Sequence, residues 1–225
     1  MPETPEVERR TFDRPIHLRA APEGANGPGI LTGYGAVFNS ESRDLGGYVE
    51  VIDPGVFDTI GEGDARMIDT GSNGRVLCRF NHDSNGLLGT TNAGTLRLFV
   101  DDIGVRYEVD LPDTQHGRDM AELARRGDLA FSSFAFRILP NGRTWRENAS
   151  GQLVAVITRA VLVDVAPVAD PAYWGSSAEM RAAVDLDAIR ASLKTTDTEA
   201  RASEVRAVAI GRARQITILT ERNHK

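Results

Sequence analysis

Three polar side chains interrupt stretches of sequence that otherwise resemble buried strands. They are His82 at the end of "RVLCRFNH", Ser133 within "LAFSSFAFRIL" and Asp164 within "AVLVDVAPV". An imidazole can take the proton of a serine hydroxyl, and a carboxylate can orient that imidazole, so the set suits acyl transfer. Plainer interpretations stay open. His82 can be a polar residue at a strand edge, Ser133 an ordinary strand serine, and Asp164 a loop cap or the partner of an arginine such as Arg159.

Two adjacent serines compete for the role of nucleophile. Alternate residues of an extended strand share a face. Ser132 shares its face with Phe134, Phe136 and Ile138, which is the more apolar face and is therefore predicted to point into the core. Ser133 is predicted to point the other way, toward an open or cleft-facing surface. If one of the two is catalytic, the pattern favours Ser133.

His82 stands out among the four histidines because it ends a strongly apolar strand, in phase with Cys78 and Phe80. Its neighbour Asp83 points to the opposite face of an ideal strand, so Asp164 is the expected orienting carboxylate. The chain has no ligand cluster of the spacing typical of metal sites, no Walker A loop and no GxGxxG motif. We therefore expect no metal and no cofactor.

Composition limits the classes of partner. The chain has 225 residues, of which 41% are hydrophobic and 26% charged, and its formal net charge is −6. A negative charge argues against nucleic acid as a partner, because phosphate binding favours a basic surface. The N-terminal "MPETPEVERR" has no apolar core, and no run approaches the roughly 18–20 apolar residues of a membrane span. With a single cysteine, these features predict a soluble intracellular protein with no membrane or nucleic-acid partner.

The elements that must position the three residues are mostly strands. "TLRLFV" and "VRYEVDL" alternate around the turn "DDIG", which predicts an antiparallel hairpin. Thr114 and Gly127 are a suitable start and end for a helix between them, and "DPGVFDTI" is predicted to start another helix at Asp53. The run "ITRAVLVDVAPV" is apolar on both faces, as expected of a central strand.

Composition and hydrophobic periodicity divide the chain into three segments. Residues 1–13 are predicted to form a disordered arm, and 14–178 a β-rich domain. Residues 179–225 have helical spacing and carry nine basic and seven acidic residues, against 17 and 25 in the preceding 178. We therefore expect a helical C-terminal tail after residue 178.

Over residues 14–178 the chain resembles the prohead proteases of tailed bacteriophages, a family distantly similar to herpesvirus assemblin. The resemblance is carried by five segments in family order, namely "LTGYGAVFNSES", "GGYVEVIDPGVF", "RFNHD…LLGTT…GTLRLFVDDIGV", "RGDLAFSSFAF" and "LVDVAPVADPAY". It implies an α+β fold, mainly β with helices, in which a compact β-barrel is ringed by helices. It also implies a serine protease that uses histidine as its base.

The resemblance assigns site residues by position. The histidine of the family's "NHD" motif falls on His82, and the serine before its "F-G-F" element falls on Ser133, with Ala135 in place of the usual glycine. Asp164 occupies the place of the third catalytic residue, which is a second histidine in the herpesvirus relatives. The loop "ADPAYWG" that follows is the expected source of oxyanion donors.

The resemblance also implies a biological role. Such an enzyme, enclosed in the procapsid in the host cytoplasm, cleaves the scaffolding segment from the major capsid protein precursor and usually cleaves itself. The viral relatives suggest a homodimer, and the tail 179–225 suits a targeting segment that is later removed. Two other classes stay open: a non-catalytic scaffold or structural module, and an unrelated serine esterase or amidase, although the chain lacks the GxSxG motif of that class.

Overall fold

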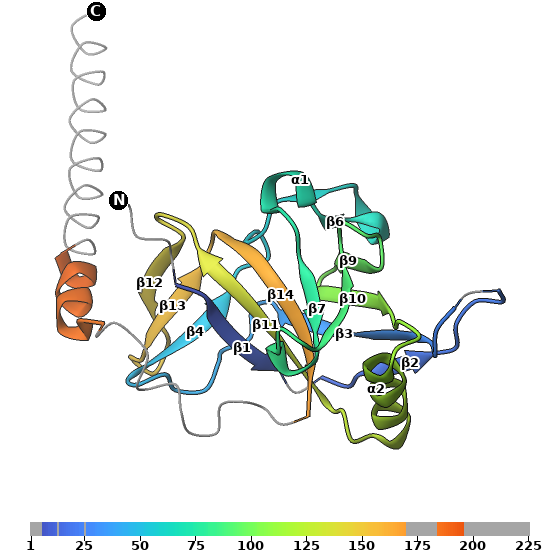
Figure 1. Cartoon of the computed structure of the whole chain (residues 1–225). Helices are drawn as coiled ribbons and strands as arrows, with labels where there is room; N and C mark the ends of the chain where they lie inside the picture. Colours follow the sequence, from blue (N-terminus) through green and yellow to red (C-terminus); the bar gives the residue numbers. More distant parts are fainter. Residues whose placement is uncertain (1–5, 13, 25, 170–183, 196–225) are drawn as a thin grey trace, which may run out of the picture.

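The computed structural model describes residues 6–12, 14–24, 26–169 and 184–195 (Figure 1). Their strands form three hydrogen-bonded sheets, so the predicted α+β class with mostly β-structure is confirmed. The predicted closed barrel is wrong for the described residues, because each sheet ends in two edge strands instead of closing on itself. The described residues form no ring of helices either. The helices longer than one 3₁₀ turn in this part of the chain are α1 (Thr70–Asn73), α2 (Gln115–Arg126) and a helix over 186–195.

The first sheet contains the strands of Ser133 and Asp164 and the strand that leads to His82. Its strand order is β1 (Glu8–Phe12), β11 (Phe131–Ile138), β14 (Ala160–Val168), β7 (Leu77–Arg79) and β8 (Leu87–Thr90). β14 lies in the middle, antiparallel to β11 and parallel to β7. This position explains why its sequence is apolar on both faces, and it confirms the predicted central strand.

The second sheet contains the predicted hairpin. Its order is β2 (His17–Arg19), β3 (Ile30–Val37), β10 (Gly104–Asp110), β9 (Leu96–Val100), β6 (Met67–Ile68) and β5 (Thr59–Ile60). Asp101 Oδ1 accepts hydrogen bonds from the backbone N–H groups of Ile103 (2.9 Å) and Gly104 (3.0 Å), which closes the turn between β9 and β10. The main core lies between this sheet and the first and includes Leu31, Tyr107, Phe134 and Val165.

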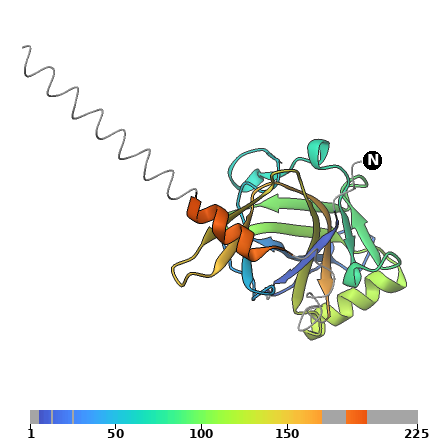
Figure 2. The ribbon, with the colours of Figure 1, turned by 90° about the vertical axis from the view of Figure 1, so that its left-hand side faces the viewer.

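The third sheet joins β12 (Arg143–Glu147), β13 (Leu153–Ile157) and β4 (Tyr48–Ile52), in that order. Figure 2 shows the helix over 186–195 against this part of the molecule. Apolar residues at its start and along it, Val184, Leu186, Ile189 and Leu193, pack on Leu45, Tyr48, Leu153 and Ala155. In the described part of the tail, residues 186–195 form a helix that covers a small second core.

α2 confirms the predicted caps. Thr114 Oγ1 accepts from the backbone N–H of Gly117, and Gly127 takes the left-handed conformation (φ 81°) that ends the helix. The helix predicted at Asp53 is wrong. Asp53 Oδ1 instead accepts from the N–H of Gly55 at 2.7 Å, an alternative that Asp offers in turns as readily as at helix starts.

The N-terminal segment departs from the predicted disorder. Glu8–Phe12 form β1, the edge strand next to β11, so the prediction is wrong for these residues (Figure 1). The physical reason is distant in sequence: Arg10 makes two hydrogen bonds, of 2.6 and 2.8 Å, to the buried carboxylate of Glu50 on β4. A polar segment that is unremarkable alone is ordered by this partner.

Candidate active site

His82 is positioned by a turn and not by the strand that was predicted to carry it. β7 ends at Arg79, and a single 3₁₀ turn follows in which Asn81 (φ 51°) and His82 (φ 58°) both adopt left-handed backbone conformations. Asn81 Oδ1 accepts from the backbone N–H of Ala169, just after β14, at 3.1 Å. Asn and His tolerate positive φ better than most residues. The predicted alternation with Cys78 therefore does not set the direction of His82.

The two serines of β11 point to opposite faces, as the alternation predicts. Ser132 Oγ lies 3.0 Å from the hydroxyl of Tyr107, and a Cβ at Gly33 would come within 2.7 Å of it, so Ser132 is enclosed in the core. Ser133 lies on the face of His82. The predicted open surface is wrong, however, because Ser133 is only 1% exposed.

The structure brings the three predicted residues together. Ser133 Oγ lies 2.7 Å from His82 Nε2, and His82 Nδ1 lies 2.5 Å from Asp164 Oδ1. Both distances are within hydrogen-bond reach, and the order is that of a hydroxyl, a base and an orienting acid. The side chain of His82 is 5% exposed and that of Asp164 is 1% exposed, so bulk water hardly screens these interactions.

Asp164 has a second partner that the sequence analysis missed. Its Oδ2 contacts the guanidinium of Arg79, so both oxygens of this buried carboxylate are engaged. Burial alone would raise the pKa of Asp164, but the hydrogen bond and charge of His82 and the charge of Arg79 outweigh it and lower that pKa. Asp164 therefore stays ionised beside His82. Asp164 thus pairs with an arginine as well as with His82, so the two alternatives are combined. The arginine is Arg79 and not Arg159.

A signal for Arg79 existed in the sequence. A carboxylate within an apolar strand requires a partner. Arg79 is the charged residue within the apolar run that leads to His82, and β7 runs parallel to β14 with Leu77 opposite Asp164. The same strand buries Cys78, and burial first, then the charge of Asp164, raises the pKa of its thiol. This cysteine is thus held neutral and is no competing nucleophile.

Ser133 also has a contact that no sequence pattern indicated. Its hydroxyl donates a hydrogen bond of 2.8 Å to the backbone carbonyl of Arg10 on β1. In the pairing of β1 with β11, Thr11 lies opposite Ser133. The edge strand therefore touches the candidate nucleophile directly.

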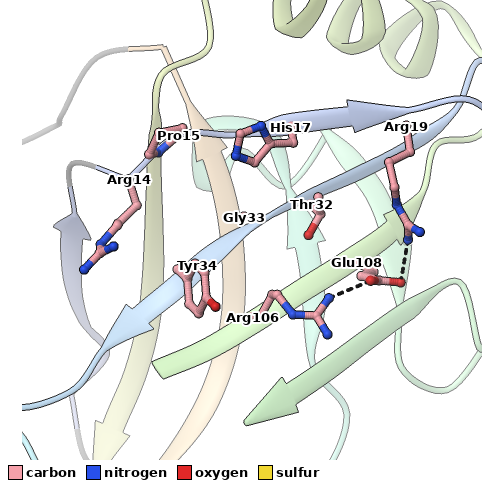
Figure 3. Close-up of a pocket in the computed structure, with 9 residues that line it drawn as sticks. All are labelled: Arg14, Pro15, His17, Arg19, Thr32, Gly33, Tyr34, Arg106 and Glu108. Atoms are coloured by element: carbon pink, nitrogen blue, oxygen red, sulfur yellow. Dashed lines mark hydrogen bonds and ion pairs between the residues drawn. The ribbon is translucent and has the colours of Figure 1, made fainter. Parts of the chain in front are cut away.

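A hollow of about 410 Å³ lies on the outer face of β2, β3 and β10 (Figure 3). It is predominantly basic; its lining includes Arg14, His17, Arg19, Arg106 and Glu108. Figure 3 shows that Arg19 and Arg106 both turn to Glu108, which lies between them. None of the three candidate residues lines this hollow, so the candidate chemistry lies elsewhere.

Two further observations concern the described residues alone. They contain no group of three or more His, Cys, Asp or Glu side chains placed to hold a metal ion. No helix in that part of the chain is long and apolar enough to cross a membrane. The expected oxyanion loop "ADPAYWG" lies, except for Ala169, outside the described residues.

A serine, a histidine and an aspartate linked in this order, with the acid held by an arginine, have the geometry of a serine hydrolase. The comparison with protein families shows which kind of serine hydrolase this is. The model of the caudovirus prohead serine protease family matches residues 15–191, and the chain belongs to that family. Searches of curated proteins and of solved structures gave no match. Membership identifies a capsid-maturation protease of tailed phages at the level of the family.

Proposed function

We propose that this chain is the endopeptidase that removes the scaffolding segment from the major capsid protein precursor during phage assembly. The observation that supports it best is the hydrogen-bonded series from Ser133 through His82 to Asp164, in a chain of the prohead protease family. As in the family, the reaction would take place within the procapsid, in the host cytoplasm.

The proposed reaction is acyl transfer in two steps. His82 Nε2 takes the hydroxyl proton as Ser133 Oγ attacks the scissile carbonyl carbon. The C–N bond then breaks, the amine leaves with the proton from His82, and an acyl-enzyme remains. In the second step water gives a proton to His82 as its oxygen attacks the ester carbon. The bond between that carbon and Ser133 Oγ then breaks, His82 returns the proton to Oγ, and the acid is released.

Asp164 has a supporting role in this proposal. Its Oδ1 accepts from the Nδ1–H of His82, which presents Nε2 to Ser133 as the proton acceptor. Arg79 holds the other oxygen and thereby limits the rotation of the carboxylate. As imidazolium forms, the nearby negative charge stabilises it.

Co-expression with the capsid precursor tests the proposal. Ser133→Ala should abolish shortening of the precursor, a loss of roughly 10⁴-fold or more. Ser132→Ala is the matched control, since it removes a hydroxyl from the same strand on the opposite face, and it should leave most of the cleavage. Equal loss from both variants, or loss from Ser132→Ala alone, would contradict the assignment.

The proposal includes self-cleavage and a homodimer. Since the helix over 186–195 packs on the third sheet, we place the removable part of the tail beyond residue 195. Mass spectrometry of the purified chain after incubation should show loss of a C-terminal fragment in the wild type and none in Ser133→Ala. A full-length chain that persists while the capsid precursor is cleaved would contradict self-removal.

A further inference from the structure

We propose that β1 occupies the site of an extended peptide substrate, so that the chain holds its own active site closed until a substrate strand replaces β1. The inference rests on the proposed function, because it takes Ser133 as the nucleophile. β1 comprises Glu8–Phe12 and so precedes residues 15–191, the part matched by the family model.

The first observation is that the candidate site is closed. Ser133 is 1% exposed, and the side chain of His82 is 5% exposed. A peptide carbonyl carbon must reach Ser133 Oγ for attack to occur. The backbone carbonyl oxygen of Arg10 already lies 2.8 Å from that atom, in the space that a substrate must enter. Substrate therefore cannot reach Ser133 while β1 stays in place.

The second observation concerns the single proton of the Ser133 hydroxyl. Two acceptors are within reach of it, His82 Nε2 at 2.7 Å and Arg10 O at 2.8 Å. A hydroxyl donates one hydrogen bond at a time. While the proton points to Arg10 O, His82 cannot withdraw it, so β1 opposes activation of Ser133 as well as access to it.

The third observation is the place of β1 in the sheet. It is an edge strand, antiparallel to β11, with five residue pairs that include Thr11 opposite Ser133. Its departure would leave the pairing of β11 with β14 intact. It would also expose the backbone N–H and C=O groups along the edge of β11, to which an extended peptide of antiparallel direction can add. The ligand of this edge is thus a peptide main chain.

Side-chain contacts with the third sheet hold β1 in place. Arg10 pairs with Glu50 on β4 at 2.6 Å, and Glu8 pairs with Arg143 on β12 at 2.9 Å. These bonds fix the N-terminal half of β1 at positions that do not touch His82 or Asp164. The closed state can therefore be weakened or locked without a change in the three candidate catalytic residues.

A reversible lock on β1 tests the proposal in the full chain. Arg9 lies opposite Ala135 in the β1–β11 pairing, so Arg9→Cys with Ala135→Cys offers a cross-strand disulfide. The oxidised double variant should cleave the capsid precursor at least tenfold more slowly than its reduced form, and reductant should restore the rate. Arg9→Cys alone should show no such dependence. An oxidised, fully cross-linked chain that cleaves as fast as the reduced chain would overturn the proposal.

A second variant covers the case in which the double variant does not fold. Arg10→Ala removes the bond to Glu50 and should speed the labelling of Ser133 by a small fluorophosphonate at least threefold. If β1 instead supports the active site, labelling should slow, and that result would also overturn the proposal. Failure of the proposed function looks different: the wild type itself would show neither labelling of Ser133 nor cleavage.

Discussion

The molecule buries two clusters of charged and polar side chains that look alike on burial and pairing but differ in what they can do. The triad cluster consists of Ser133, His82, Asp164 and Arg79. The β1 anchor consists of Arg10, Glu50, Glu8 and Arg143. Each joins segments far apart in the sequence, and each contains a carboxylate whose side chain is 1% exposed, Asp164 in one and Glu50 in the other.

The difference lies in the groups at the end of each cluster. The β1 anchor pairs guanidinium groups with carboxylates. Burial would lower the pKa of Arg10, but the charges and hydrogen bonds of Glu50 and Glu8 outweigh it and raise that pKa further. The triad cluster instead ends in an imidazole and a hydroxyl, between which a proton can pass. Buried charge alone thus does not mark a catalytic site. A transferable proton next to it does.

The largest expected effect is loss of proteolytic activity when a member of the triad cluster is removed. His82→Ala removes the proton acceptor of the triad cluster and should reduce cleavage of the capsid precursor by roughly 10⁴-fold or more, as Ser133→Ala does. Since members of one catalytic unit are not additive, the double variant should be no worse than either single variant. A time course of precursor shortening measures this. Losses that multiply in the double variant would contradict a shared step.

The next effect tests the orienting acid. Asp164→Asn keeps the size of the side chain but favours the wrong tautomer of His82, so the rate should fall by roughly 10⁴-fold. The same kinetic assay checks it. Asp83→Asn is the matched control, because this exposed carboxylate follows His82 directly in sequence and should leave the rate within twofold of the wild type. A similar loss in both variants would remove Asp164 from its assigned role.

Loss of the β1 anchor should lower stability without removing the reactivity of Ser133. Glu50→Ala leaves the Arg10 guanidinium buried without its main partner, which should lower the free energy of unfolding by about 3–5 kcal/mol. Denaturant titration measures that loss. Labelling of Ser133 by a fluorophosphonate should persist in the folded variant and be faster than in the wild type, because the Arg10–Glu50 bond that holds β1 is lost. Labelling lost without any loss of stability would erase the distinction between the clusters.

The smallest expected effect is a change in the pH dependence of the free energy of unfolding. The folded-state pKa of Asp164 lies below its ordinary value of about 3.9, so the carboxylate adds stability above that pH and loses it as pH falls through the folded pKa. The free energy of unfolding should therefore fall more steeply below about pH 4 in the wild type than in Asp164→Asn. Denaturant titrations at several acidic pH values compare the two. Parallel curves would show that Asp164 is not held ionised by His82 and Arg79.

Much of this molecule could be predicted from local sequence. The β9–β10 hairpin, the caps of α2 at Thr114 and Gly127 and the central strand β14 follow from alternation and turn chemistry, which act over a few residues. Three members of the triad cluster, Ser133, His82 and Asp164, were identifiable because each interrupts an apolar run. No single apolar run shows that these three residues lie close together. The resemblance to the prohead proteases indicated that they do.

The parts that could not be predicted depend on distant partners. β1 is ordered by Glu50, forty positions from Arg10, and its sequence alone is that of a polar arm. The direction of His82 depends on two consecutive left-handed residues, Asn81 and His82, where alternation predicts a continuing strand. β1 covers Ser133. The wrong prediction of a disordered N-terminal arm therefore led to the wrong prediction that Ser133 faces an open surface.

The most direct test of the proposed mechanism is the position of a covalent label. The purified chain would be treated with a fluorophosphonate, and the modified residue located by fragmentation mass spectrometry. The proposed mechanism predicts one adduct on Ser133, lost in Ser133→Ala and in His82→Ala and kept in Ser132→Ala. An adduct on Ser132, or labelling of Ser133 that persists in His82→Ala, would contradict it.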